Sequence, residues 1–168
     1  MGVFESIGHR SSSGGITGAL LRLVLRLFQF VLALTVAGLY GIDLHHAHEW
    51  DQQHPPSQQV GADPKWVYAE VVAGLSAVAC IVYGLPFFKS YWAFAWDWVL
   101  FILWTALFGV FGRIYITAHP TPKQAGIIRM KHAVWVDLAS MILWFITAIY
   151  STVIWHRGRL SRSMSSKV

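Results

Sequence analysis

The stretch Trp98–Gly112, WVLFILWTALFGVFG, contains no charged side chain. Three more runs of the same kind are Leu27–Ile42, Val71–Phe88 and Leu138–Trp155. Each run has 15 to 18 residues, whereas about 20 are needed to cross a hydrocarbon core of about 30 Å, so flanking residues must complete each span. The sequence therefore predicts an all-α integral membrane protein, a bundle of four transmembrane helices.

The composition argues against two other fold classes. Hydrophobic residues make up 55% of the chain and charged residues 12%. A soluble helical bundle would carry a polar stripe on every helix, and these runs have none. A membrane β-barrel would alternate apolar and polar residues along each strand instead of forming continuous apolar runs.

Flanking tryptophans, prolines and charges set the expected boundaries within a single membrane domain. We expect helices at about 23–42, 66–88, 92–116 and 133–155, forming a domain over 23–155. Residues 1–22 are expected to form a flexible tail, and 156–168 a basic, serine-rich tail. The short link after the second helix predicts that helices two and three are tight antiparallel neighbours.

The distribution of Lys and Arg predicts an M-shaped topology with both termini in the cytoplasm, because cytoplasmic segments carry the excess of these residues. The side with the termini would carry eight Lys and Arg residues, and the opposite side would carry five. The first set is Arg10, Arg22, Arg26, Lys89, Arg157, Arg159, Arg162 and Lys167; the second is Lys65, Arg113, Lys123, Arg129 and Lys131.

The net charge of +5 favours anionic lipid as a partner over nucleic acid in so apolar a chain. Lys89, Arg157, Arg159 and Arg162 are the candidate headgroup-binding residues. The lone cysteine, Cys80, excludes an internal disulfide and a two-cysteine redox centre. No cofactor is expected.

Small residues predict where helices pack closely, since membrane helices gain little from burying apolar surface against one another. The candidate packing positions are Ala33, Ala37, Gly41, Ala73, Gly74, Ala77, Gly84, Thr105 and Gly109. Chance is the alternative explanation, because Gly and Ala are common in membrane helices. We also expect a homo-oligomer, without a defined stoichiometry.

Charged residues near the helix ends predict two ionic clusters. Antiparallel threading places Glu70, Arg113 and Asp137 at similar depth, and Arg129 or Lys131 could complete that cluster. Its roles could be a clamp that fixes helix order or a proton or cation site. Near the other interface, Asp97 could pair with Arg22, Arg26 or Lys89.

The first loop contains a group of histidines with acidic neighbours. The candidate metal ligands there are His45, His46, His48 and Glu49, because imidazole suits zinc or copper. The spacing matches no closed tetrahedral motif, so a solvated loop is the alternative. A haem is disfavoured, because His119, His132 and His156 all lie near helix ends.

Five strings, spread over about residues 22–155, carry a family resemblance. They are LYGIDL (39–44), KWVYAE (65–70), WDW (96–98), FGR (111–113) and RMKHAVWVDL (129–138). Together with the four helices and the histidine-bearing loop, they resemble fungal MARVEL-domain proteins. The resemblance implies a four-helix module that takes part in membrane apposition, vesicle traffic or the organisation of sterol-rich domains. It implies no catalytic residues.

The expected function is that of a non-enzymatic membrane organiser, acting through lipid contacts and self-association in the plasma membrane or in secretory or endosomal membranes. The alternative is a transporter or channel-like protein that uses Glu70, Arg113 and Asp137. An intramembrane enzyme is the third class, and the loop histidines would be its only candidates.

Overall fold

Four long helices and one short 3₁₀ turn make up the described part of the fold. The computed structural model describes residues 15–59, 61, 63–84, 93–117 and 125–165, and these ranges contain no β-strand. The helices are α2 (Gly15–Gln53), α3 (Pro64–Gly84), α4 (Ala93–Tyr115) and α5 (Ala125–Ser165), with the turn η1 at Pro56–Gln58.

All four helices are long and apolar enough to cross a membrane, so the chain is a multi-pass helical membrane protein. The 21 residues of α3 and 23 of α4 match the roughly 20 required. With 39 and 41 residues, α2 and α5 are about 60 Å long at 1.5 Å per residue. Both therefore extend well past the hydrocarbon core.

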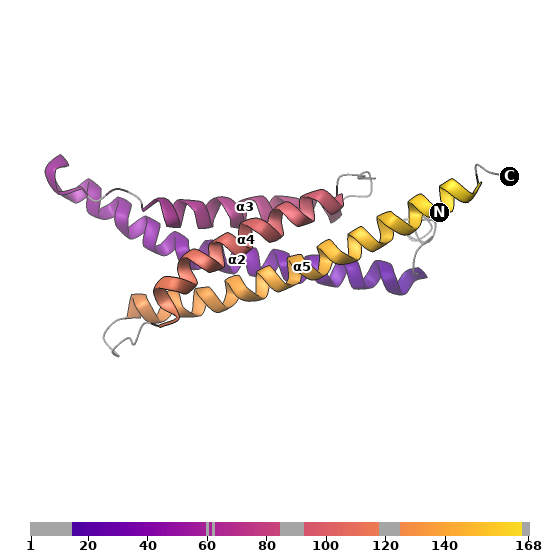
Figure 1. The fold of residues 1–168 in the computed structure, drawn as a ribbon. Coiled ribbons are helices and arrows are strands. Elements are labelled where there is room, and N and C mark those ends of the chain that lie inside the picture. The colour runs from indigo at the N-terminus through magenta and orange to yellow at the C-terminus, as the bar shows by residue number, and fades with distance from the viewer. Residues whose placement is uncertain (1–14, 60, 62, 85–92, 118–124, 166–168) are drawn as a thin grey trace.

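The helices run alternately in opposite directions (Figure 1). α2 begins and α5 ends at the same end of the bundle, which we call the terminal end. α2 ends and α5 begins at the opposite loop end, where these two helices separate. The closest pairings join α2 to α3 and α4 to α5, and α2 also packs against α5.

The first helix is longer than the apolar run predicts. It ends at Gln53 instead of Ile42, so the histidine-bearing segment is helical and not a loop. Contacts at four-residue spacing, such as His45 with Glu49 and His48 with Gln52, follow from that helix. The helix stops before Pro55 and Pro56, which cannot continue it.

The core contains aromatic and small side chains. Trp104, Trp144, Tyr40 and Phe111 are its largest fully buried members. Contrary to the prediction, α3 and α4 are not tight neighbours: they approach one another less than the other packed pairs do. Their contacts run through large side chains, as when the Trp104 indole Nε1 donates to Ser76 Oγ at 2.9 Å.

The small residues divide into two groups. Ala33 and Ala73 are buried, Ala37 and Ala77 are half-buried, and Gly41 packs against Glu70.

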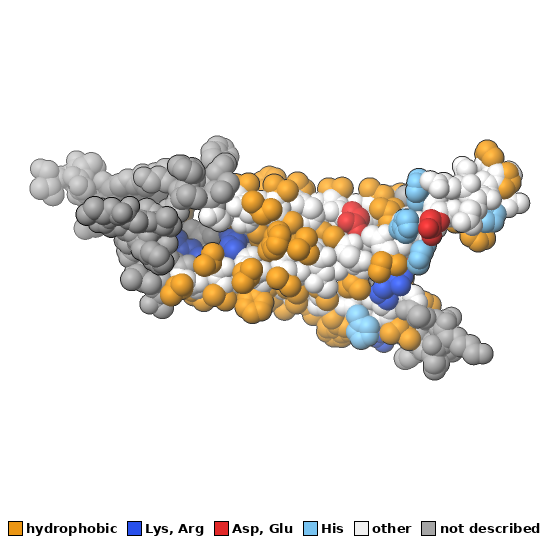
Figure 2. Space-filling model, turned by 180° about the vertical axis from the view of Figure 1, so that it is seen from behind, with side chains coloured by type: hydrophobic (Ala, Val, Ile, Leu, Met, Phe, Trp, Pro, Cys, Tyr) orange, Lys and Arg blue, Asp and Glu red, His pale blue; other side chains and the backbone are white. Residues whose placement is uncertain are grey.

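The other four positions predicted to pack inside the bundle are exposed: Gly74, Gly84, Thr105 and Gly109. An added Cβ on any of these glycines would meet no atom within 4 Å. The prediction is wrong for Thr105 and Gly109 because the bulky side chains of Leu100, Trp104, Leu107 and Phe111 define the inner face of α4. On α3 the buried face consists of Ala69, Val72, Ala73, Ser76, Ala79 and Cys80, which leaves Gly74 and Gly84 outside it. Figure 2 shows apolar side chains over the middle of one outer face, with histidines and charged side chains toward the loop end.

Candidate functional site

Polar side chains gather where the α2–α3 pair meets the α4–α5 pair, a boundary that we call the seam. Its contacts join Arg26 to Asp97, Gln29 to Thr147, Tyr40 to Asp137, Asp43 to Arg129, Tyr68 to the Leu103 carbonyl, and Trp104 to Ser76. Interhelical hydrogen bonds of this kind are worth about 0.6 to 2 kcal/mol each in membranes. The seam therefore fixes which helix faces which.

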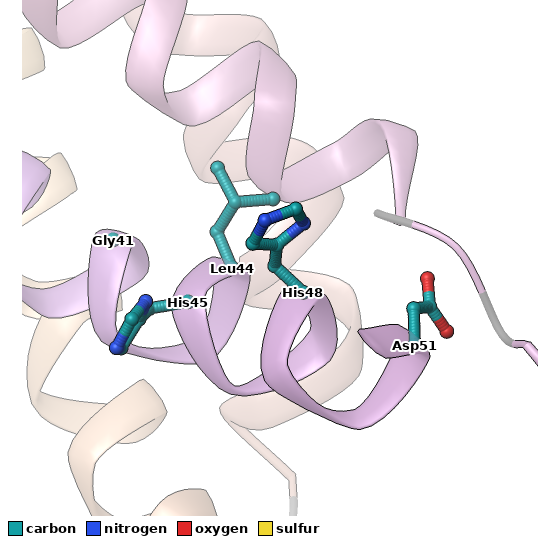
Figure 3. A pocket seen from close by; sticks show the side chains of 5 residues that line it. All are labelled: Gly41, Leu44, His45, His48 and Asp51. Carbon is teal, nitrogen blue, oxygen red and sulfur yellow. The ribbon is translucent and has the colours of Figure 1, made fainter. Parts of the chain in front are cut away.

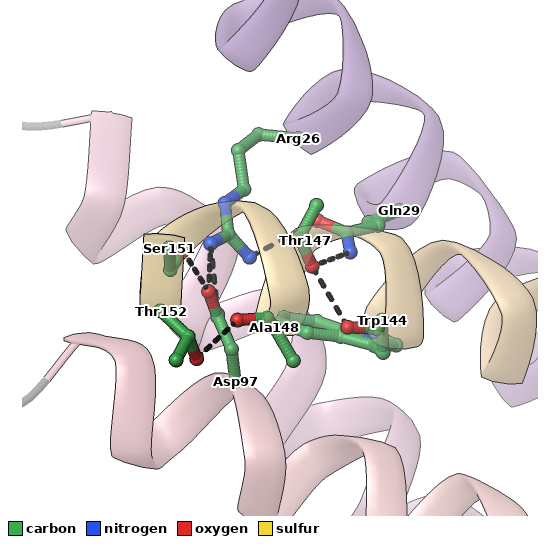
Figure 4. A network of polar contacts seen from close by, with 8 residues as sticks. All are labelled: Arg26, Gln29, Asp97, Trp144, Thr147, Ala148, Ser151 and Thr152. Atoms are coloured by element: carbon green, nitrogen blue, oxygen red, sulfur yellow. Dashed lines mark hydrogen bonds and ion pairs between the residues drawn. The ribbon is translucent and has the colours of Figure 1, made fainter. Parts of the chain in front are cut away.

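A buried ion pair lies at the terminal end of the seam (Figure 4). The Arg26 Nη2 atom donates to both carboxylate oxygens of Asp97, at 2.8 and 2.9 Å. Asp97 is fully buried, and the Arg26 side chain is 17% exposed. The Ser151 hydroxyl donates to Asp97 Oδ2 at 2.8 Å. The carboxylate thus accepts three hydrogen bonds, which offset part of its desolvation.

The Arg26 guanidinium has further partners on the neighbouring helices. It lies over the rings of Tyr83 and Trp144, with its Cζ atom 4.3 and 5.0 Å from their centroids. Its Nη1 atom donates to Gln29 Oε1 at 3.1 Å. The Gln29 Nε2 atom in turn donates to Thr147 Oγ1 at 3.1 Å. One cation therefore joins all four helices.

Two polar contacts tie α2 to α5 nearer the loop end. The Tyr40 hydroxyl donates to Asp137 Oδ2 at 2.7 Å, and both residues are fully buried. Arg129 Nη2 donates to Asp43 Oδ1. Tyr40 and Asp43 are three residues apart and share one face of α2. These two contacts and the hydrogen bond between Gln29 and Thr147 together fix the position of α5 along α2.

The predicted cluster of Glu70, Arg113 and Asp137 is not assembled. Arg113 is exposed, and among the described residues no ion pair or hydrogen bond joins it to either acid. Glu70 lies against Gly41, whereas Asp137 bonds Tyr40. Consecutive helical residues point about 100° apart, so the two acids approach α2 from different sides.

The other members of that predicted cluster also have different surroundings. Arg129 pairs with Asp43, and Lys131 is half-buried. The depth of a charge along its helix does not fix its direction around that helix.

Four buried polar atoms around residues 40–43 of α2 have no hydrogen-bond partner within the described part of the chain. They are Asp43 Oδ2, Glu70 Oε1, Arg129 Nε and Asp137 Oδ1. Glu70, Arg129 and Asp137 contact residues 40–43 of α2, and Asp43 is one of those residues. The seam is thus well paired at the terminal end and underpaired at the loop end.

The predicted metal ligands do not converge. Over the described residues, no three His, Cys, Asp or Glu side chains are placed to hold a metal ion. His45 lies 3.3 Å from Glu49, but the His45 and His46 rings are 6.5 Å apart. The prediction is wrong in this respect, because a continuous helix sends neighbouring side chains in different directions.

A shallow pocket of about 410 Å³ lies beside these histidines. It is lined by Gly41, Leu44, His45, His48 and Asp51. Figure 3 shows His45 and His48 pointing in different directions from α2. The His48 ring contacts Gln52 at 2.8 Å, and Asp51 Oδ2 accepts from the Gly61 amide at 3.0 Å. These side chains brace the end of α2 and the segment after it.

The predicted headgroup-binding residues lie outside what the structure describes. Lys89 is outside the described ranges, and so are the side chains of Arg157, Arg159 and Arg162, although α5 continues through Ser165. Arg22, a candidate partner for Asp97, donates to the Gly18 carbonyl in its own helix at 3.1 Å and lies 5.9 Å from the Tyr150 ring centroid.

Several seam residues escaped prediction from the sequence. The most informative is Gln29, the one amide inside the first apolar run, which is 1% exposed. On α5, Ser140, Thr147 and Ser151 follow the predicted Asp137 at successive spacings of three, seven and four residues, which places them on its face. Uncharged polar residues inside apolar runs were the available signal.

Comparison with protein-family models, curated proteins and solved structures finds no match for this chain.

Proposed function

We propose that the chain is a non-enzymatic membrane organiser that associates with copies of itself and with lipid. The terminal end faces the cytoplasm in this proposal, in keeping with the excess of Lys and Arg there. The resemblance to fungal MARVEL-domain proteins supports the same class and suggests the plasma membrane or secretory or endosomal membranes.

One observation carries the proposal: Thr105 and Gly109 lie on the outer side of α4. Both are exposed, and the space beside Gly109 is open within 4 Å. Two small residues four apart let another helix approach the backbone closely. Because the fold does not use this surface, it is available to α4 of a second copy.

The lipid-facing surface agrees with an organising role. Large apolar side chains are exposed on every helix, including Leu27 of α2, Val78 of α3, Ile102 of α4 and Ile146 of α5. The buried ion pair of Arg26 and Asp97 instead holds α2 and α4 together. A bundle whose polar groups are used internally offers the membrane an apolar exterior.

The substitution Gly109→Leu tests self-association. A leucine there fills the close-approach surface while leaving the core untouched, so we expect the oligomer to become monomeric. Native mass spectrometry of protein extracted with its surrounding lipid measures both copy number and retained lipid.

The matched control is Gly38→Leu, which adds the same side chain at another exposed glycine with open space around it. It should leave the copy number unchanged. A wild-type protein that is monomeric and retains no lipid would contradict the proposal, and so would equal effects of the two substitutions.

A further inference from the structure

The unpartnered atoms at the loop end require a ligand that can both donate and accept hydrogen bonds. Three of them are carboxylate oxygens and one is a guanidinium nitrogen. An unsatisfied polar group in a membrane costs several kcal/mol, so buried groups of this kind are paired with protein or with water. Glu70 Oε1 lies on the Gly41 side of α2, whereas the other three atoms lie where α2 meets α5.

The geometry around α2 leads from the end of the bundle to these atoms. The Arg129 and Asp43 side chains are 25% and 16% exposed, so they reach the surface. They lie nearer the loop end, and Asp137 lies further in, against Tyr40. Asp137 is fully buried and keeps one oxygen without a partner, so it marks the inner limit of the underpaired region.

We propose that the seam holds a water-filled crevice that enters from the loop end and stops at Asp137. Its walls carry the carboxylates of Asp43 and Asp137 and the single guanidinium of Arg129, so it admits small cations in preference to anions. Beyond Asp137 the paired groups of Gln29, Thr147, Arg26 and Asp97 keep the seam dry.

Ala133 is the natural reporter of this crevice. It is fully buried and lies midway between Arg129 and Asp137 at four-residue steps, which places the three on one face of α5. Ala148, also fully buried, lies in the paired part of the seam. Because Cys80 is the only cysteine, a Cys80→Ala background allows each position to be labelled alone.

The experiment measures the reaction of Ala133→Cys and Ala148→Cys with small methanethiosulfonate reagents in phosphatidylcholine nanodiscs. A cationic ethyltrimethylammonium reagent and an anionic ethylsulfonate reagent are compared. We expect position 133 to react at least about tenfold faster than position 148, and the cationic reagent to react about tenfold faster than the anionic one at position 133.

The variant Asp43→Asn, made together with Ala133→Cys, tests the source of the charge preference. It removes one negative charge at nearly constant shape, so the cation preference should fall while labelling continues. Val134→Cys, at a residue 1% exposed and one position along α5, replaces Ala133→Cys if that protein does not fold.

Three results would overturn the proposal. The first is equal protection of positions 133 and 148, which means that water does not enter. The second is equally fast labelling of both, which means that the whole seam opens. The third is an anionic reagent that reacts as fast as the cationic one at position 133.

Discussion

Arg26 contacts a side chain from each of the other three helices. Its partners are Tyr83 on α3, Asp97 on α4 and Trp144 on α5. A guanidinium suits this position because it can donate in its own plane while its faces lie against aromatic rings. The residue is therefore a structural junction near one end of the membrane-spanning region.

Replacing Asp97 by Asn should destabilise the bundle by about 3 to 5 kcal/mol, because it leaves the Arg26 charge buried without its counter-charge. Unfolding in mixed micelles of increasing denaturing-detergent content measures the loss. The double variant Arg26→Met, Asp97→Leu removes both charges and should recover much of it. A double variant that is no better than the single one would show that the ion pair is not the cause.

At this scale, part of the site could be predicted from the sequence. The expected depth of Asp97 near one interface and its negative charge were enough to name Arg26 among its possible partners. The same reasoning grouped Glu70, Arg113 and Asp137, which the fold separates. Depth along a helix follows from residue number, but the direction around it depends on packing. Packing depends on uncharged residues such as Tyr40 and Gly41.

At the scale of the helices, apolar runs predict the spans well and the ends poorly. All four runs lie inside helices except for the part of the second run after Gly84, which is outside the described residues. α2 continues to Gln53 and α5 begins at Ala125, because a helix needs no apolar run where it leaves the membrane. Hydropathy identifies the part of a helix that lies in lipid, whereas Pro and Gly indicate where the helix can end.

The start of α3 has a specific cap. The Lys65 amide donates to Asp63 Oδ1 at 3.0 Å, directly before the membrane-spanning part of the helix. This hydrogen bond lowers the pKa of Asp63 below its ordinary value of 3.8. The cap therefore stabilises the fold at pH values above that ordinary pKa and is lost as the pH falls through the lowered pKa.

The substitution Asp63→Ala should cost about 1 kcal/mol at neutral pH, the usual effect of losing such a cap. The difference from wild type, followed by circular dichroism during unfolding in micelles, should shrink as the pH falls below about 4. Asp63→Ser keeps a capping oxygen without a charge and should retain most of the stability at both pH values. A pH-independent effect of Asp63→Ala would contradict this account.

For the whole molecule, the chain is two helical hairpins joined by a polar seam. α2 with α3 and α4 with α5 form the closest pairs, and the seam supplies the specific contacts between them. Apolar packing alone discriminates weakly between partners in lipid, so hydrogen bonds select the correct arrangement. The number of helices could be predicted from the sequence, but this division into pairs could not.

The pair Gln29→Cys, Thr147→Cys in the Cys80→Ala background tests that arrangement. The two wild-type side chains meet at 3.1 Å. Because cysteine is shorter than glutamine, a short bifunctional methanethiosulfonate reagent should link the two cysteines within one chain. A faster-migrating monomer band on non-reducing gels measures this link. Leu34→Cys with Thr147→Cys is the control, because Leu34 is 51% exposed and should not cross-link. A dimer band would instead indicate exchange of hairpins between copies.

The ion pair between Arg26 and Asp97 also sets an order of events during synthesis. The two residues are 71 positions apart, so Arg26 leaves the ribosome long before its counter-ion exists. A nascent chain with only α2 and α3 inserted carries a cation whose acidic partner has not been made. Completion of α4 supplies the missing acidic partner. A chain interrupted before α4 therefore differs from the finished protein by an unneutralised charge, which the machinery of membrane quality control can detect.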